Sequence, residues 1–439
     1  MNRLSLSRLY DRIRHRFYNR IENSRFLANF VSIAKANIFS QLLLLAATPI
    51  LTRLYSPADF GLAAIFLTSV QIIGSFCTWK FDRTIPNART SYAARQLAAF
   101  GLATVITVAT LSLLLVRQNP WGFLNFSSFE KLGALLYWLP LAIIATGLVQ
   151  LGSAWYARKT KLTAVSYSVV AYSLLYLTSA LAAGVIGLGT GGLIFSSVFA
   201  LWCQVVVLIC LNSTEPFVSK GTIRRTSVVL SRNIKTASVA SVVTFVNTIS
   251  FAAPVYLLSH KFQLSEVGLY VLMVRIIATP LGTITKSLSL SFWSRAAQLA
   301  RAGNYKNIWH LYLKVSFTLS LLAIAIIIIC FTISRYIAVI LGEYWIDAGP
   351  VLIASIPYLV GLAIVSPTNH LIVLGKQSLQ LYADGLRLAL LVLIIYCGGK
   401  FDLSFTDTVF LFSCASLAGH ICLMLTHMWI YKVLLATNK

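Results

Sequence analysis

Polar side chains recur at helical spacing inside several long apolar stretches of this sequence. Two of these stripes contain arginine, and their members are Arg275, Thr279, Gly282 and Lys286 in one stretch and Gln377, Gln380, Asp384 and Arg387 in another. Spacings of three and four residues place each set on one face of an α-helix. A charge at the centre of a bilayer costs between about 3 and well over 10 kcal/mol if it faces lipid. We therefore expect Arg275 and Arg387 to face a wet cavity or an anionic partner.

Four further apolar stretches carry polar stripes without arginine. Their members are Asn37, Gln41 and Thr48; Thr68, Gln71, Ser75 and Thr78; Thr244, Asn247 and Thr248; and Ser413, Ser416, His420 and His427. Such side chains either hydrogen-bond neighbouring helices or line a cavity, and the spacing leaves both possibilities open. Up to four bases and one acid lie within or beside a cavity among these stripes, so such a cavity would attract an anion, and arginine binds phosphate bidentately.

These stripes supply the candidate site. The predicted substrate-binding residues are Arg275, Lys286, Arg387, Asn37, Gln41, Gln71 and Asn247, and the candidates for ion coupling are Asp384 and His420. Two simpler interpretations compete with this one. Asp384 and Arg387 are three residues apart and can neutralise each other. Lys286 lies near the predicted cytoplasmic end of its helix, where its long side chain can extend to the headgroups.

No pattern in the sequence indicates catalysis or metal binding. A P-loop, a GxSxG nucleophile motif, an HExxH motif and a zinc-type Cys/His spacing are all missing from the 439 residues. The seven cysteines lie in or beside apolar runs with no CxxC pair, which is typical of small buried side chains and not of disulfides. We therefore expect a protein that is not an enzyme and that uses neither a cofactor nor a metal.

The composition identifies the elements that must position these residues. The chain is 58% hydrophobic and 11% charged, with a mean hydropathy of +0.80, whereas soluble domains are about a quarter charged. A membrane-spanning helix needs about 20 apolar residues, and the lengths here, without period-two alternation, exclude a β-barrel. The sequence thus predicts an all-α polytopic membrane protein with twelve transmembrane helices near 31–52, 60–79, 96–116, 133–153, 163–185, 191–212, 236–258, 266–289, 311–333, 349–373, 379–397 and 407–430.

The distribution of basic residues predicts the orientation. The net charge is +24, from 36 Lys and Arg against 12 Asp and Glu. With the N-terminus inside, 25 bases lie in cytoplasmic segments, 6 in outer loops and the remaining five within helices. The positive-inside rule therefore places both termini in the cytoplasm. Anionic headgroups at that face are the partners of the basic charge, including the arm at residues 1–30, and no nucleic-acid partner is expected.

An internal repeat organises the predicted helices. Leu54-Tyr55-Ser56-Pro57-Ala58-Asp59-Phe60-Gly61-Leu62 has a counterpart 207 residues later in Phe262-Gln263-Leu264-Ser265-Glu266-Val267-Gly268-Leu269. Six helices intervene, so both copies have one orientation, and the sequence predicts two pseudo-symmetric six-helix lobes around a central cavity. The predicted divisions are a basic arm (1–30), an N-lobe (31–212), a cytoplasmic linker (213–235), a C-lobe (236–430) and a cytoplasmic tail (431–439).

Several segments, in their order and spacing, resemble Wzx-type polysaccharide flippases of the MOP transporter superfamily. They are Leu54–Leu62, Lys80–Ile85, Glu266–Tyr270, Phe292–Ala297 with the loop up to Gly303, and Leu341–Leu352. The resemblance implies alternating access in a bacterial inner membrane. It also implies an undecaprenyl-diphosphate-linked oligosaccharide, an O-antigen or lipopolysaccharide precursor, moved from the cytoplasmic to the outer leaflet. Other membrane proteins of polysaccharide assembly are expected as further partners. The shared motifs are structural, so the site residues above come from the stripes alone.

Two other functions were compared with this one. A MATE-type multidrug antiporter shares the architecture but typically uses intramembrane carboxylates, and only Asp384 qualifies here. A membrane polymerase or ligase of glycan assembly usually needs a large outer loop for its active site, and the predicted outer loops are short. The sequence favours the flippase.

Overall fold

In the computed structural model the described residues are 35–118, 127–211, 223–301, 305–365, 379–400 and 402–437, and all regular structure within them is helical. After a first helix at Lys35–Leu54, the elements are α2 (Pro57–Phe76), η1 (Phe81–Arg83), α3 (Ser91–Gln118), α4 (Ser127–Leu132), η2 (Gly133–Trp138), α5 (Leu139–Arg158), α6 (Leu162–Ile186), α7 (Gly189–Leu211), α8 (Ile223–Lys261), α9 (Leu264–Arg301), α10 (Tyr305–Leu341), η3 (Glu343–Trp345), α11 (Ala348–Ala354), α12 (Ile356–Val365), α13 (Gln380–Lys400) and α14 (Phe405–Thr437). The predicted basic arm at 1–30 lies outside this range.

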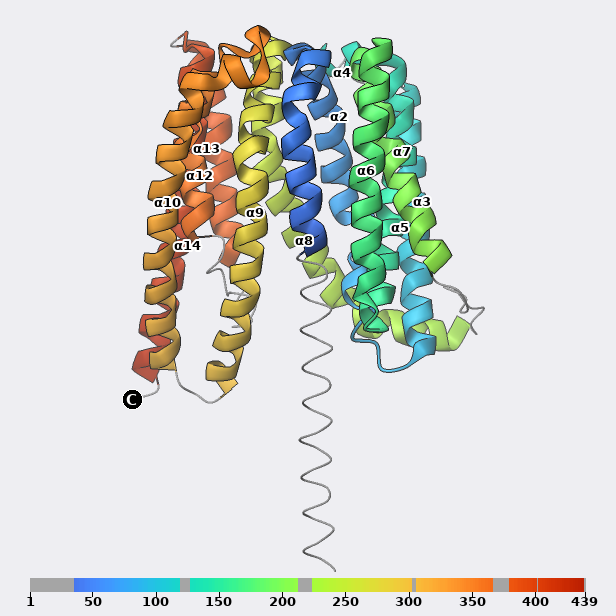
Figure 1. The fold of residues 1–439 in the computed structure, drawn as a ribbon. Coiled ribbons are helices and arrows are strands. Elements are labelled where there is room, and N and C mark those ends of the chain that lie inside the picture. Colours follow the sequence, from blue (N-terminus) through green and yellow to red (C-terminus); the bar gives the residue numbers. More distant parts are fainter. Residues whose placement is uncertain are drawn as a thin grey trace, which may run out of the picture.

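The helices run side by side as a membrane bundle (Figure 1). Eleven of those in the described ranges are long and apolar enough to cross a bilayer, and the number is twelve if one bent pair forms a single span. The predicted all-α polytopic fold is thereby confirmed. We call the end of the bundle that carries Ser56 and Gln263 the outer end, because the charge distribution predicts that orientation.

The helices pack in two groups. Helices α3 to α7 pack mainly with one another or with α2, and α10 to α14 pack mainly with one another or with α8 and α9 on the other side of the bundle (Figure 1). Contacts of α2 with α8 and α9 join the groups. The first helix stands between the groups, beside α9, so residues facing the interior can come from both halves.

The two copies of the repeat meet where α2 crosses α9. A β-carbon added to Gly61 would collide with the backbone oxygen of Leu264, and one added to Gly268 would collide with the backbone oxygen of Pro57. Only glycine allows the two helix backbones to approach this closely. Both glycines belong to the acid-x-Gly-Leu core, so the repeated motif forms a helix crossing near the outer end.

Other contacts close the outer end around this crossing. The Trp345 ring nitrogen donates a hydrogen bond to the Thr52 oxygen at 3.0 Å, and its ring lies edge-on to Phe60 with centroids 5.4 Å apart. The hydroxyls of Ser69 and Tyr256 are 2.7 Å apart. These pairs join α2 and the first helix to η3 and α8, and so hold the two groups together. The Trp345 contacts lie near the outer end, whereas Ser69, twelve residues after the start of α2, lies deeper in the bundle.

Capping at the helix starts explains the acids in the repeat. The Asp59 amide donates to the Ser56 hydroxyl oxygen at 3.2 Å, and the Ser56 amide donates to the Asp59 carboxylate at 3.1 Å. This is a complete capping box. In the second copy the Gln263 amide donates to the Glu266 carboxylate at 2.9 Å. Both acids therefore stabilise helix N-termini.

The Lys80–Ile85 segment, part of the family resemblance, is a packed turn after α2. Phe81 and Ile85 lie in a buried cluster with Leu97 and Trp155, and the Thr78 hydroxyl donates to the Asp82 carboxylate at 2.5 Å. Lys80 is buried in a left-handed backbone conformation, with φ at 54°. Burial lowers the pKa of its ammonium group, and the nearby Asp82 charge opposes part of that effect. The segment is therefore structural, as expected.

Several helix boundaries differ from the prediction. The linker predicted as a loop over 213–235 is helical from Ile223, and α9 continues to Arg301 through the segment 292–297 that was expected to form a loop. Polar residues can continue a helix beyond the apolar span, so hydropathy marks only the apolar part. The single helix predicted over 349–373 is also wrong, since it breaks at Ser355 with a 51° bend between Glu343–Ala354 and Ile356–Ile364.

Candidate functional site

A small pocket lies among helices from both halves of the molecule. The first helix contributes Gln41, Leu44, Leu45, Thr48 and Leu51; α9 contributes Leu272, Arg275, Ile276, Thr279 and Pro280; and α2 and α6 contribute Phe60 and Tyr176. We call this the Arg275 pocket. Its wall is mostly apolar, with a few polar groups, which is the usual composition of a ligand site.

Arg275 is the charged member of the pocket. Its side chain is exposed, and among the described residues it has neither an ion pair nor a hydrogen bond. It lies eleven residues after the start of α9, which corresponds to about 16 Å along the helix. That depth is near the middle of a hydrocarbon core about 30 Å thick. A guanidinium there must be surrounded by water or meet an anion from outside the described residues.

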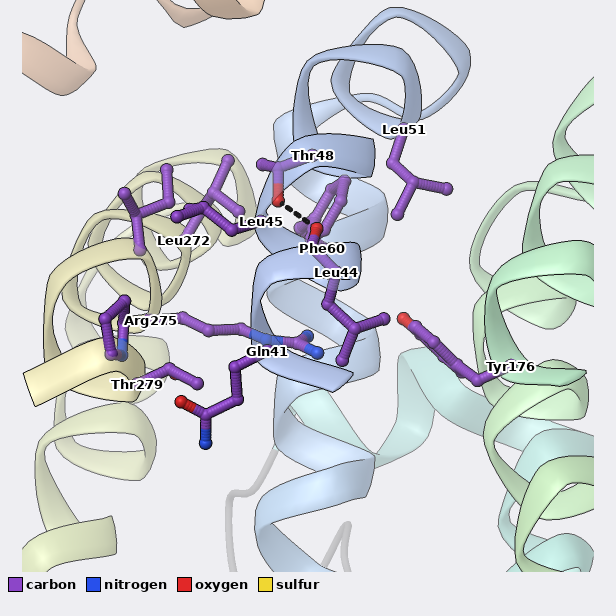
Figure 2. Close-up of a pocket in the computed structure, with 12 residues that line it drawn as sticks. Gln41, Leu44, Leu45, Thr48, Leu51, Phe60, Tyr176, Leu272, Arg275 and Thr279 are labelled. Carbon is purple, nitrogen blue, oxygen red and sulfur yellow. Dashed lines mark hydrogen bonds between the residues drawn. The ribbon is translucent and has the colours of Figure 1, made fainter. Parts of the chain in front are cut away.

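Other polar side chains line the same pocket. Figure 2 shows Arg275 extending from α9 toward the first helix and the Tyr176 hydroxyl directed toward that helix from α6, while the Gln41 amide points away from the guanidinium. The Thr48 hydroxyl donates to the Leu44 oxygen at 2.8 Å within its own helix. The pocket thus offers a cation with amide and hydroxyl groups elsewhere in its lining, a set that suits a phosphate group and its attached polar moiety.

The second predicted arginine lies in a different environment. Arg387 is 3% exposed and forms an ion pair with Asp384, with Nη2 and Oδ1 3.3 Å apart. Its Nε donates to the Ser250 hydroxyl at 2.7 Å, and the Asn247 amide donates to the other Asp384 oxygen at 2.9 Å. The Ser250 hydroxyl also donates to the Asp384 main-chain oxygen at 2.9 Å. Every charge in this cluster, which we call the Asp384–Arg387 cluster, has protein partners.

Aromatic rings and close backbone contacts surround the same cluster. The Arg387 guanidinium carbon lies 3.6 Å from the centre of the Phe251 ring, a cation–π contact. The His420 ring is 6.2 Å from Phe251, and its Nδ1 lies 2.7 Å from the Ser416 oxygen. Gly361 and Gly419 let α12 and α14 approach His420 and Arg387. This packing holds α8, α12, α13 and α14 together.

A family described as "Polysaccharide biosynthesis protein" matches residues 50–350, more than half of the sequence. The chain belongs to this family. By sequence, no curated protein matched it.

Solved structures similar to this polysaccharide biosynthesis protein are transporters of the MOP superfamily type. The lipid II flippase MurJ in an inward closed conformation has a TM-score of 0.70 at 13% identity, covering 91% of this chain and 87% of that one. An inward-facing multidrug resistance MATE transporter has a TM-score of 0.61 at 11% identity, with coverage of 92% and 100%. A MOP superfamily transporter from Pyrococcus furiosus has 0.59 at 14%, with coverage of 92% and 96%. At these identities the likeness concerns the fold.

Most of the predicted site residues of this family member lie in two separate places. Gln41 and Arg275 come together in the Arg275 pocket, whereas Asn247, Asp384, Arg387 and His420 come together in the cluster. Asn37 and Gln71 line neither, with Asn37 half-buried in the first helix and Gln71 exposed on α2. Lys286 belongs to α9, but its side chain lies outside what the structure describes.

Sequence reasoning missed several participants. Thr279 belongs to the Arg275 stripe and was not selected, although its spacing places it beside the arginine. Ser250 follows Asn247 by three residues, so helical spacing could have extended that stripe to it. Tyr176 and Phe251 carry no local signal, because aromatic residues are common in membrane helices and only tertiary packing brings these two to the charges.

Proposed function

We propose that this protein moves an undecaprenyl-diphosphate-linked oligosaccharide from the cytoplasmic to the outer leaflet of a bacterial inner membrane by alternating access. The Arg275 pocket receives the anionic headgroup. The observation that carries the proposal is an exposed guanidinium near mid-membrane depth with neither an ion pair nor a hydrogen bond among the described residues. A diphosphate supplies the missing anion, and a guanidinium binds it through two parallel hydrogen bonds.

The position of the pocket supports transport in preference to catalysis. Its walls come from the first helix, α2, α6 and α9, so both halves of the molecule contact whatever it holds. Relative movement of the halves would then change the access to the pocket without any covalent step. The contacts Gly61–Gly268 and Thr52–Trp345 join the two halves at the outer end, which suits loading from the cytoplasmic side.

The antiporter alternative depends on Asp384, because it is the carboxylate within the predicted spans that could bind a cation or proton. That carboxylate already has Arg387 and Asn247 as partners. The cluster therefore favours a structural pair, and we assign Arg387, Asn247 and His420 to the framework and not to substrate contact. Ion coupling through Asp384 stays a prediction with its own test.

Complementation of a deletion strain tests the proposal. Arg275→Ala should abolish surface polysaccharide at normal membrane expression, while Arg275→Lys should restore only part of it because one ammonium cannot reproduce the bidentate contact. Arg335→Ala is the matched control, since Arg335 is also an exposed arginine in a long helix but lies outside the pocket. Full complementation by Arg275→Ala would remove the headgroup assignment. Accumulation of a lipid-linked oligosaccharide inside the deletion strain would identify the substrate.

A further inference from the structure

A long apolar groove runs beside the Arg275 pocket, between the first helix, α9 and α10. Its lining residues are Leu45, Thr48, Pro49, Met273, Ile276, Ile277, Pro280, Leu281, Ile284, Leu322, Ile326, Ile329, Ile333, Ile337, Ile340, Leu341 and Leu352. Thr48 alone among these has a polar side chain, and its hydroxyl is bonded to the Leu44 oxygen. The groove therefore presents only hydrocarbon to an occupant.

The groove and the Arg275 pocket are adjacent. Leu45, Thr48, Ile276 and Pro280 line both of them. A molecule with an anionic head and a hydrocarbon tail can therefore place its head beside Arg275 and its tail in the groove. The anionic head would then avoid the apolar groove, and the hydrocarbon tail would avoid the polar pocket.

The length of the groove selects a long chain. On α10 the lining extends from Leu322 to Leu341, which corresponds to about 28 Å along the helix. That is close to the full hydrocarbon thickness of about 30 Å, whereas the acyl chain of a phospholipid occupies one leaflet, half of that thickness. A polyprenyl chain is long enough to follow the whole groove.

We propose that this groove binds the polyprenyl chain of the lipid-linked substrate while the diphosphate lies at Arg275. The inference rests on the proposed function and adds a tail site to it. Since lipid is as apolar as the groove, transfer of the chain from bilayer to groove gains packing contacts, not hydrophobic free energy. The role of the groove is thus to guide the tail and keep it out of the wet pocket while the head moves.

Two adjacent residues of α10 give a matched test. Ile329 lines the groove and Ile328 does not, although both are exposed, at 47% and 60%. A benzophenone amino acid replaces each in turn in the full-length protein, in vesicles that contain undecaprenyl diphosphate, and the adducts are identified by mass. We expect at least fivefold more polyprenyl adduct at position 329 than at position 328. Equal labelling, or phospholipid adducts alone at both positions, would overturn the tail site.

A second measurement separates this inference from the proposed function. Ile329→Trp should reduce binding of undecaprenyl diphosphate at least fivefold, a larger reduction than Ile328→Trp causes. The same substitution should leave the Arg275-dependent binding of inorganic diphosphate unchanged. If inorganic diphosphate binding depends on Arg275 but Ile329→Trp has no effect on the lipid, the groove is wrong and the headgroup site stands. If position 329 is labelled selectively but no binding depends on Arg275, the groove stands and the headgroup assignment fails.

Discussion

Arg275 and Arg387 begin from the same sequence signal and end in opposite environments. Both lie in polar stripes of apolar helices, yet Arg387 is buried with a carboxylate, a hydroxyl and an aromatic ring around it. Arg275 is exposed in a pocket without an anion from the described part of the protein. A buried charge must be paired inside the fold, whereas an unpaired charge must find its partner elsewhere. The missing partner, more than the charge itself, distinguishes a binding residue from a framework residue.

The largest expected difference between the two arginines is in stability. Arg387→Ala should lower the free energy of unfolding by about 3–5 kcal/mol, because the Asp384 carboxylate would stay buried without its counter-ion. Arg275→Ala should change it by less than about 0.5 kcal/mol, as for an exposed side chain. Denaturant unfolding in one detergent, followed by circular dichroism, compares the two. Equal losses would show that the environments are not different.

The carboxylate of the pair gives a second, smaller effect. Asp384→Asn should cost about 1.5–3 kcal/mol, the range for hydrogen bonds to a charged group. Combining it with Arg387→Gln should recover part of the loss, because no unpaired charge remains. Transport should be equally impaired with and without an imposed pH gradient. Loss of only the gradient-driven component, with substrate binding intact, would instead assign Asp384 to proton coupling.

Two glycines compare the packing around Arg387 with that along the helix of Arg275. A β-carbon on Gly419 would lie 3.0 Å from the Arg387 β-carbon, whereas one on Gly282 of α9 would meet nothing within 4 Å. Gly419→Ala should therefore cost about 1–3 kcal/mol through overpacking. Gly282→Ala should be neutral or stabilise α9 by up to about 1 kcal/mol, the difference in helix propensity. Unfolding of both variants measures the difference, and a costly Gly282→Ala would contradict the open space beside this part of α9.

The smallest expected effect concerns the aromatic contact. Phe251→Leu keeps an apolar side chain but removes the cation–π contact with Arg387, which should cost about 0.5–2 kcal/mol. In an Arg387→Met background most of that cost should vanish, because the two residues act as one pair. A double-mutant cycle of unfolding free energies provides the test. An unchanged cost in both backgrounds would mean that Phe251 contributes packing alone.

The sequence could predict the class of fold and the faces of the helices but not the partners across helices. Spacing placed Thr279 beside Arg275 and Asp384 beside Arg387, because neighbours three and four apart share a helix face. Asn247 and Ser250 join Asp384 and Arg387 from 137 residues away, and local spacing contains nothing about that distance. For this reason the stripes could not separate the pocket arginine from the framework arginine.

Helix ends and breaks were also beyond the reach of hydropathy. Helix α8 begins at Ile223 and α9 ends at Arg301, in segments that are polar enough to resemble loops. The bend at Ser355 lies in an apolar run without an interruption in hydropathy. The polar helix ends depend on packing against other helices, which composition does not record. The bend has a local signal instead, because Pro357 lacks the N–H that a continuous helix would use.

The glycine crossing between α2 and α9 has the form of a dimer interface inside one chain. Gly61 approaches Leu264, and Gly268 approaches Pro57. Gly268 is the repeat equivalent of Gly61, and Leu264 is the repeat equivalent of Pro57, 207 residues later in each case. The two contacts are therefore the same contact made twice. Such an arrangement is isologous, the relation that identical subunits show about a two-fold axis. One surface is thus used against its own copy. A half-length ancestor with this motif could make the same contact with a second molecule of itself, and fusion of two such halves would preserve the contact while freeing every other position to diverge, including the one that became Arg275.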